Sequence, residues 1–292
     1  MTFSYAGMVE RNIGFVSESE QEKIARASVF VCGVGGMGGA AVQSLARAGV
    51  GHITIADIDR FELSNLNRQV FCTSATIGQS KVEAAREAIS RINPSACVAI
   101  HGADWLGNLD DILATCSIII NGMDDIAAGI ALYRKAKSHG ATVIDAYTSP
   151  LPSVTVVGAD APRPEERLRF PSVGRAPFTL SRQELDACRE AEILYVMVNS
   201  SSATHIDLGV AAKLLAGKRA RPSFAPMVIT TGNLMAFEAV NLILGRPSAV
   251  DHRGVFFNPW TFEVERPRLA PSQWLRKRVA RQLMKRLSGA VS

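Results

Sequence analysis

The sequence predicts an α/β fold: a Rossmann-like, mainly parallel sheet with helices on both faces, extended by C-terminal antiparallel strands. Three observations lead to it. Short apolar runs alternate with helical runs in the first half of the chain, a glycine-rich turn follows the first apolar run, and acidic residues stand where later runs end. Such alternation gives parallel strands covered by helices on both faces. Ligands in these sheets bind at the carboxyl ends of the strands.

The elements of the first half follow in order. A serine cap and early acidic residues predict a helix over 17–27, with Lys23 and Arg26 near its end. Small residues over 40–48 predict a helix that packs close to the sheet, and Asn93-Pro94 ends an amphipathic helix over 80–92. Further helices are expected over 109–115 and 126–138. Strands are expected over 29–32, 53–56, 98–101, 117–121 and 142–145.

The pattern changes after Tyr147. Residues 153–159 alternate like an antiparallel strand, and residues 227–244 predict a helix with small and apolar faces. Residues 255–258 and 261–264 predict a hairpin around Pro259-Trp260. The segment from about 160 to 220 is rich in Pro and Arg at its start, so we expect an irregular insertion or crossover, with one helix over 181–191. We therefore predict one domain over 1–270, followed by a basic tail over 271–292.

The composition is that of a soluble globular protein. Of the 292 residues, 47% are hydrophobic and 20% are charged, and the apolar runs are shorter than the ~20 residues that a membrane span needs. The N-terminus has neither the basic nor the apolar region of a secretory signal, which predicts a cytoplasmic location. Five cysteines without a CxxC pair argue against a disulfide framework, and no zinc is expected.

Positive charge is concentrated at the C-terminal end. The net charge is +5, but the residues from Arg268 onward carry seven positive charges and no acid, so the rest of the chain sums to −2 (five minus seven). The tail predicts a basic amphipathic helix. This helix could bind nucleic acid, anionic membrane or an acidic peptide, or it could pack on its own domain. Its apolar face comprises Trp274, Leu275, Val279, Leu283 and Leu287.

The glycine-rich turn predicts a phosphate-binding loop. Glycines let the backbone approach a phosphate, and the following helix presents free N–H groups. Alone, the motif favours an NAD-dependent dehydrogenase. Asp57, at the end of the second strand, fits a ribose ligand in both cases, and Asp59 lies beside it. The glycines of the turn are Gly33, Gly35, Gly36 and Gly38.

Two cations favour ATP chemistry over hydride transfer. Arg68 lies in SNLNRQ and Lys81 in IGQSK, and a cluster of cations suits the negative charge that grows on the α-phosphate and on departing pyrophosphate. Asn65 and Asn67 add neutral donors. Asp124 follows the fourth strand and is a candidate Mg²⁺ ligand, although it or its neighbour Asp125 could instead cap the next helix.

The motifs RNIG, GVGGMGG, DID, SNLNRQ, IGQSK, INP and MDD, in this order, resemble the ThiF/MoeB/HesA superfamily of ubiquitin-activating-like adenylyltransferases. The resemblance is close from Arg11 to Asp145 and weaker from Pro226 to Val264. It implies a homodimer that binds Mg·ATP and adenylates a carboxylate, often the C-terminus of a small ubiquitin-like protein or peptide. It also implies that Gly36 lies in the phosphate loop and that Arg11 is donated across the dimer interface.

The chain departs from better-known members of this superfamily at several points. It lacks their paired CxxC motifs and the catalytic cysteine of the ubiquitin activators, and it has Asp124-Asp125 where Asp-Asn is usual. Cys188, beside Arg189, is a candidate catalytic thiol, although a packing role on an amphipathic helix is the stronger interpretation. We therefore expect an ATP-dependent adenylyltransferase. The alternatives are an NAD-dependent oxidoreductase, a tRNA-modifying dehydratase of the same superfamily, and a scaffold without adenylation activity that binds a partner.

Overall fold

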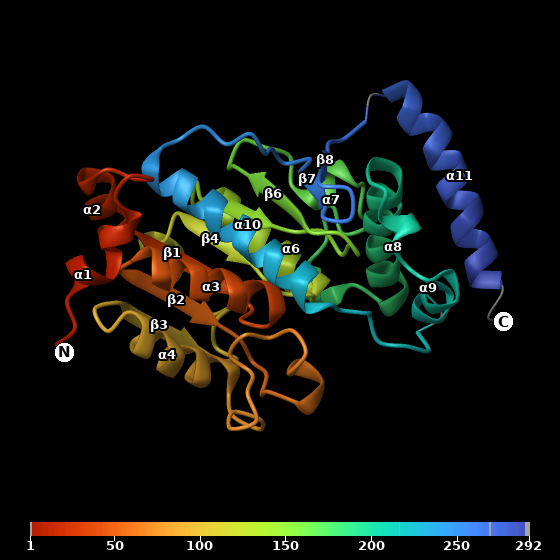
Figure 1. Ribbon diagram of the computed structural model, residues 1–292. Coiled ribbons are helices and arrows are strands. Elements are labelled where there is room, and N and C mark those ends of the chain that lie inside the picture. The colour runs from red at the N-terminus through yellow and green to blue at the C-terminus, as the bar shows by residue number, and fades with distance from the viewer. Residues whose placement is uncertain (1, 216, 269, 290–292) are drawn as a thin grey trace.

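The computed structural model describes residues 2–215, 217–268 and 270–289, which form an eight-stranded sheet surrounded by helices (Figure 1). The strand order is β3-β2-β1-β4-β5-β6-β7-β8. Strands β1 to β5 are parallel, and β6, β7 and β8 continue the sheet in antiparallel pairs, so the predicted fold class is confirmed. The strands are β1 Ser28–Cys32, β2 His52–Ala56, β3 Cys97–His101, β4 Ile118–Asn121, β5 Thr142–Asp145, β6 Ser153–Val157, β7 Val255–Asn258 and β8 Glu263–Glu265.

Helices cover both faces of the sheet because successive side chains of its central strands point to opposite sides. Val29 and Val31 of β1 pack with α3, α4 and α10, whereas Phe30 and Cys32 pack with α5 and α6. The helices are α1 Tyr5–Val9, α2 Glu18–Arg26, α3 Gly36–Ala48, α4 Lys81–Ile92, α5 Leu109–Thr115, α6 Ile126–Ser138, α7 Pro164–Arg167, α8 Arg182–Asn199, α9 Leu208–Leu215, α10 Ala225–Leu244 and α11 Ala270–Gly289. Short 3-10 turns are η1 Glu10–Asn12, η2 Leu63–Asn65, η3 Pro177–Thr179 and η4 Ser202–Thr204.

Local signals in the sequence account for the helix ends. Ser17 and Glu20 form a reciprocal capping box at the start of α2, and Ser181 and Glu184 form another at the start of α8. At the far end of α3, Gly49 adopts a left-handed conformation (φ 92°) and closes the helix.

Helix α10 returns from late in the sequence to cover α3. It is the one helix in the described part of the chain that is long and apolar enough to cross a membrane, but it lies along α3 and contacts β4, β5 and β6. The two helices approach closely: a Cβ atom on Gly232 would lie 2.3 Å from the carbonyl oxygen of Met37. Glycine is therefore required at this crossing.

The segment expected to be irregular is largely helical. It contains α7, α8 and α9, and α8 continues to Asn199, eight residues beyond the predicted end at 191. The tail forms α11, which packs on α8 and α9 with Ala280 buried between them.

Candidate active site

The glycine-rich turn lies where the order of the parallel strands reverses, between β1 and β4. Gly33 N–H donates to Ala56 O, and Gly122 N–H donates to Cys32 O, both at 2.7 Å, so the turn is anchored to the ends of β1, β2 and β4. A Cβ atom on Gly38 would lie 1.8 Å from Gly33 O, which excludes any other residue there. No side chain caps the first turn of α3 in the described structure. Its N–H groups are therefore available to an anion.

Asp57 is fixed beside this turn. Its Oδ2 accepts from the Val34 N–H at 2.8 Å, and its Oδ1 accepts from the Asp59 N–H at 2.9 Å. The carboxylate thus lies at the end of β2, next to the loop, as a ribose ligand requires.

The two predicted cations, Lys81 and Arg68, make different contacts near the loop. Lys81 Nζ lies 2.8 Å from Asp59 Oδ2, and Lys81 is only 7% exposed. Arg68 donates to Ser64 O and to Asn67 Oδ1, each at 2.8 Å. The stem of Arg68 borders Gly36, since a Cβ atom on this glycine would lie 3.8 Å from Arg68 Cγ.

The two asparagines of SNLNRQ differ in their contacts. Asn65 is buried, and its Oδ1 accepts from the Glu62 N–H at the start of η2, so its amide shapes the loop. Asn67 is exposed and donates through Nδ2 to Ser223 O at 2.8 Å. This bond joins the loop to the segment before α10, a contact that sequence reasoning missed.

Asp124 is the uncommitted carboxylate of the site. Asp125 caps α6 by accepting from the Ala128 N–H at 2.9 Å, whereas Asp124 is exposed and has no hydrogen bond or ion pair to another described residue. Among the described residues, no group of three or more His, Cys, Asp and Glu side chains is arranged around a common metal position. A single free carboxylate beside a phosphate loop nevertheless fits Mg²⁺, which binds one or two carboxylates together with phosphate oxygens.

A cavity of about 800 Å³ opens on the Asp124 side of the loop. Its inner wall holds a polar cluster that sequence reasoning missed: Asp145 Oδ2 accepts from Asn121 Nδ2 at 2.9 Å and from the Tyr133 hydroxyl at 2.8 Å. Burial raises the pKa of Asp145 to about 7. Because Asn121 and Asp145 end β4 and β5, the rule that ligands bind at strand ends could have identified both.

The opposite wall of the cavity comes from the segment interpreted as an insertion. Helix α8 contributes Arg182 and Arg189, the α7 region contributes Arg163, and Arg221 comes from the connection between α9 and α10. Arg163 and Arg189 are paired with Glu166 and Asp186, and acidic Glu192 also faces the cavity. The wall therefore presents mixed charge to a ligand.

Cys188 lies on the side of α8 that faces away from solvent. Its side chain is fully buried among Ile130, Phe170 and Leu180, and burial raises the pKa of its thiol despite the adjacent Arg189. A thiolate is disfavoured in such surroundings. Its position therefore favours the packing role over the catalytic one.

Arg11 is remote from the loop of its own chain. It belongs to η1, where the neighbouring Asn12 donates to Ala48 O at the C-terminal end of α3. The glycine loop stands at the other end of this 13-residue helix, roughly 20 Å away at 1.5 Å per residue. The structure therefore does not bring Arg11 together with Arg68 and Lys81.

Comparisons with known proteins show the family and similar folds. The chain is 31% identical over 236 residues to the molybdopterin-synthase adenylyltransferase of Salmonella typhimurium, which covers 78% of each chain. Its fold is similar to that of PaaA (TM-score 0.60, 19% identity, 92% of this chain and 76% of PaaA). It is also similar to the E. coli tRNA N6-threonylcarbamoyladenosine dehydratase TcdA (TM-score 0.58, 18% identity, 82% of this chain and 95% of TcdA). Residues 9–275 match the ThiF family, so this chain belongs to the ThiF family and is an adenylyltransferase of that family.

Proposed function

We propose that the crevice binds Mg·ATP and converts a carboxylate to an acyl-adenylate: ATP + R–COO⁻ → R–CO–AMP + pyrophosphate. One observation carries this proposal. The uncapped start of α3 follows β1 and is bordered by Arg68, and the exposed Asp124, which pairs with no other described residue, follows the neighbouring strand β4. Positive groups for a triphosphate and a ligand for its metal ion thus lie at one edge of the sheet.

The chemistry follows from these groups. A substrate carboxylate oxygen forms a bond to the α-phosphorus as the bond to the pyrophosphate oxygen breaks. No general base is needed, because a carboxylate is ionised at neutral pH. The α3 N–H groups, Arg68 and Lys81 would stabilise charge on the phosphates, and Asp57 would hold the ribose. Mg²⁺ held by Asp124 would supply further neutralisation of that charge.

We infer that the acyl substrate enters through the cavity beside Asp124. The Salmonella typhimurium relative is named for its action on molybdopterin synthase, a protein, which supports the C-terminus of a small protein or peptide as substrate. A cavity of about 800 Å³ also accommodates groups larger than an extended diglycine tail. Side chains or a bulky acyl group can therefore contact Asp145 and the α8 wall.

We further propose that the active form is a homodimer in which Arg11 reaches the partner's triphosphate. The distance along α3 separates Arg11 from the loop of its own chain, so only a second chain could use it. Apolar side chains are available for association: Phe15 is 88% exposed, and Phe237 on α10 is 64% exposed.

The decisive experiment is an ATP–pyrophosphate exchange screen with small ubiquitin-like proteins, ribosomal peptides and small acids. We expect exchange with one class of carboxylate and none with the Asp124→Ala variant. Membership of the ThiF family favours this activity over NAD-dependent oxidation. Thermal stabilisation by NADH but not by Mg·ATP would contradict the proposal.

A further inference from the structure

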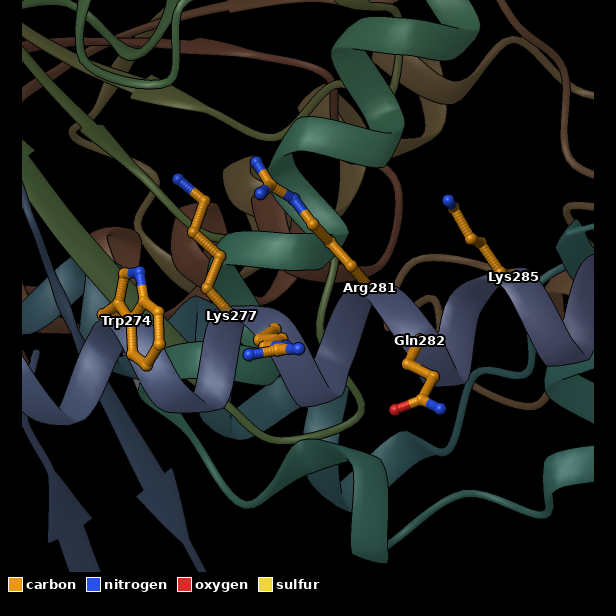
Figure 2. A pocket seen from close by; sticks show the side chains of 6 residues that line it. Trp274, Lys277, Arg281, Gln282 and Lys285 are labelled. Atoms are coloured by element: carbon orange, nitrogen blue, oxygen red, sulfur yellow. The ribbon is translucent and has the colours of Figure 1, made fainter.

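The C-terminal helix α11 presents a row of cations and one indole to solvent. Trp274, Lys277, Arg281 and Lys285 are exposed and lie at spacings of three or four residues, which places them on one side of the helix. Figure 2 shows the side chains of Lys277, Arg281 and Lys285 extending from the same side of α11, with Trp274 at the start of the row. Together with Arg278 and Gln282, they line a hollow of about 580 Å³.

The opposite side of α11 is already occupied by the domain. Ala280 is buried, and Arg276 donates to Ser200 O at 3.1 Å at the end of α8. Gln273 donates to Asn199 Oδ1 at 3.3 Å. The helix is therefore held with its row of cations facing outward.

The charge on this row is uncompensated. From residue 270 to residue 289 there are six cations and no acid, and within the described structure no ion pair involves Lys277, Arg281 or Lys285. Residues four apart on a helix are about 6 Å apart along its axis, so the row is a regular ladder of positive charge. A polyanion with closely spaced charges matches it.

We propose that this face of α11 binds single-stranded nucleic acid, with phosphates along Lys277, Arg281 and Lys285 and a base stacked on Trp274. Cations combined with an exposed aromatic ring are the features by which proteins hold single strands. The helix packs on the domain through its opposite side. Leu275 and Val279 lie beside the row and are also exposed, so an anionic bilayer, which would bury such apolar side chains, is the competing occupant that the test includes.

The proposed surface adjoins the active-site cavity through α8. Helix α8 supports α11, and side chains of the same helix that include Arg182, Arg189 and Ile193 line the cavity. A strand bound on α11 would thus lie one helix away from the cavity. Binding to α11 does not depend on adenylation, so the two proposals can fail separately.

Fluorescence anisotropy with labelled 12-nucleotide RNA and DNA of mixed sequence tests the proposal. Each neutralised phosphate contributes about 0.7 to the slope of log K against log salt for single strands, so Arg281→Ala/Lys285→Ala should reduce the slope by about 1.4. The matched control is Arg86→Ala/Arg91→Ala, which removes the same charge from exposed positions of α4 and should leave the slope unchanged. Trp274→Ala should weaken binding about tenfold, and Trp274→Phe should restore part of it.

Competition identifies the kind of partner. The affinities for the RNA and the DNA oligonucleotide show which kind of single strand this face binds more tightly. Vesicles of anionic phospholipid and poly-glutamate serve as the other polyanions. Binding to vesicles or poly-glutamate with no preference for oligonucleotide, or an unchanged affinity in the Arg281→Ala/Lys285→Ala variant with a native circular dichroism spectrum, would overturn the proposal.

Discussion

Replacing Lys81 by methionine separates its charge from its packing. The Lys81 side chain is only 9% exposed, and its ammonium group is paired with Asp59, whose side chain is 61% exposed. Methionine keeps most of the buried apolar stem and removes the charge. Because Asp59 is largely solvated, the loss of this ion pair should reduce the free energy of unfolding by less than about 1 kcal/mol.

Lys81→Ala removes the packing of the side chain as well as its charge. It removes about three buried methylene groups, worth roughly 2 kcal/mol, and should lower Tm by about 3 °C in a chain of this size. We expect both variants to lose 10²- to 10³-fold in pyrophosphate exchange, about the effect of removing one preorganised donor from a transition state. Only the alanine variant should show the larger drop in Tm.

The assay is ATP–pyrophosphate exchange with the carboxylate that supports it in the wild type, together with calorimetric titration of Mg·ATP. Arg86→Met is the control, because Arg86 lies on the same helix, exposed and paired with Glu83. Exchange by Lys81→Met within threefold of wild type would remove Lys81 from the mechanism.

Three further predictions follow from the site. Arg11→Ala and Asp124→Ala should each abolish exchange, and heterodimers that combine them should regain about a quarter to half of the activity; verified heterodimers without activity would refute action in trans. The pKa of Asp145 is raised to about 7, so between pH 4 and 7 the folded state binds more protons than the unfolded state and stability should fall as pH rises. Asp145→Asn should remove that fall, measured as Tm from pH 5 to 8, and parallel profiles would contradict the assignment. Cys188→Ala should retain exchange within a few fold with a modest decrease in Tm, because the thiol is fully buried; loss of exchange at unchanged Tm would restore a catalytic role.

The sequence predicted the central sheet well because its strands are buried on both faces and read as short apolar runs. It placed β1, β4 and β5 within one residue of their ends. The helix predicted after the glycine-rich turn starts at residue 40, whereas α3 begins at Gly36. Glycines have low helix propensity, but tertiary contacts with the turn and with α10 hold them in the helix.

The candidate site was predicted residue by residue only where motifs lie near strand ends. Gly33, Asp57 and Asp124 could be assigned to one crevice on that ground, since they follow β1, β2 and β4. The bond between Asn67 and Ser223 joins positions 156 residues apart, so no local pattern reports it. The hydrogen bond from Tyr133 of α6 to Asp145 likewise depends on how α6 packs on the sheet rather than on composition.

The return of α10 onto α3 has a consequence for synthesis on the ribosome. The apolar side of α3 emerges about 190 residues before the helix that covers it. At 5–20 residues per second this is a delay of roughly 10–40 s. During that time the apolar side of α3 is exposed on the nascent chain. A C-terminal truncation before residue 225 should therefore yield aggregates, and chaperones should bind the wild-type chain during translation.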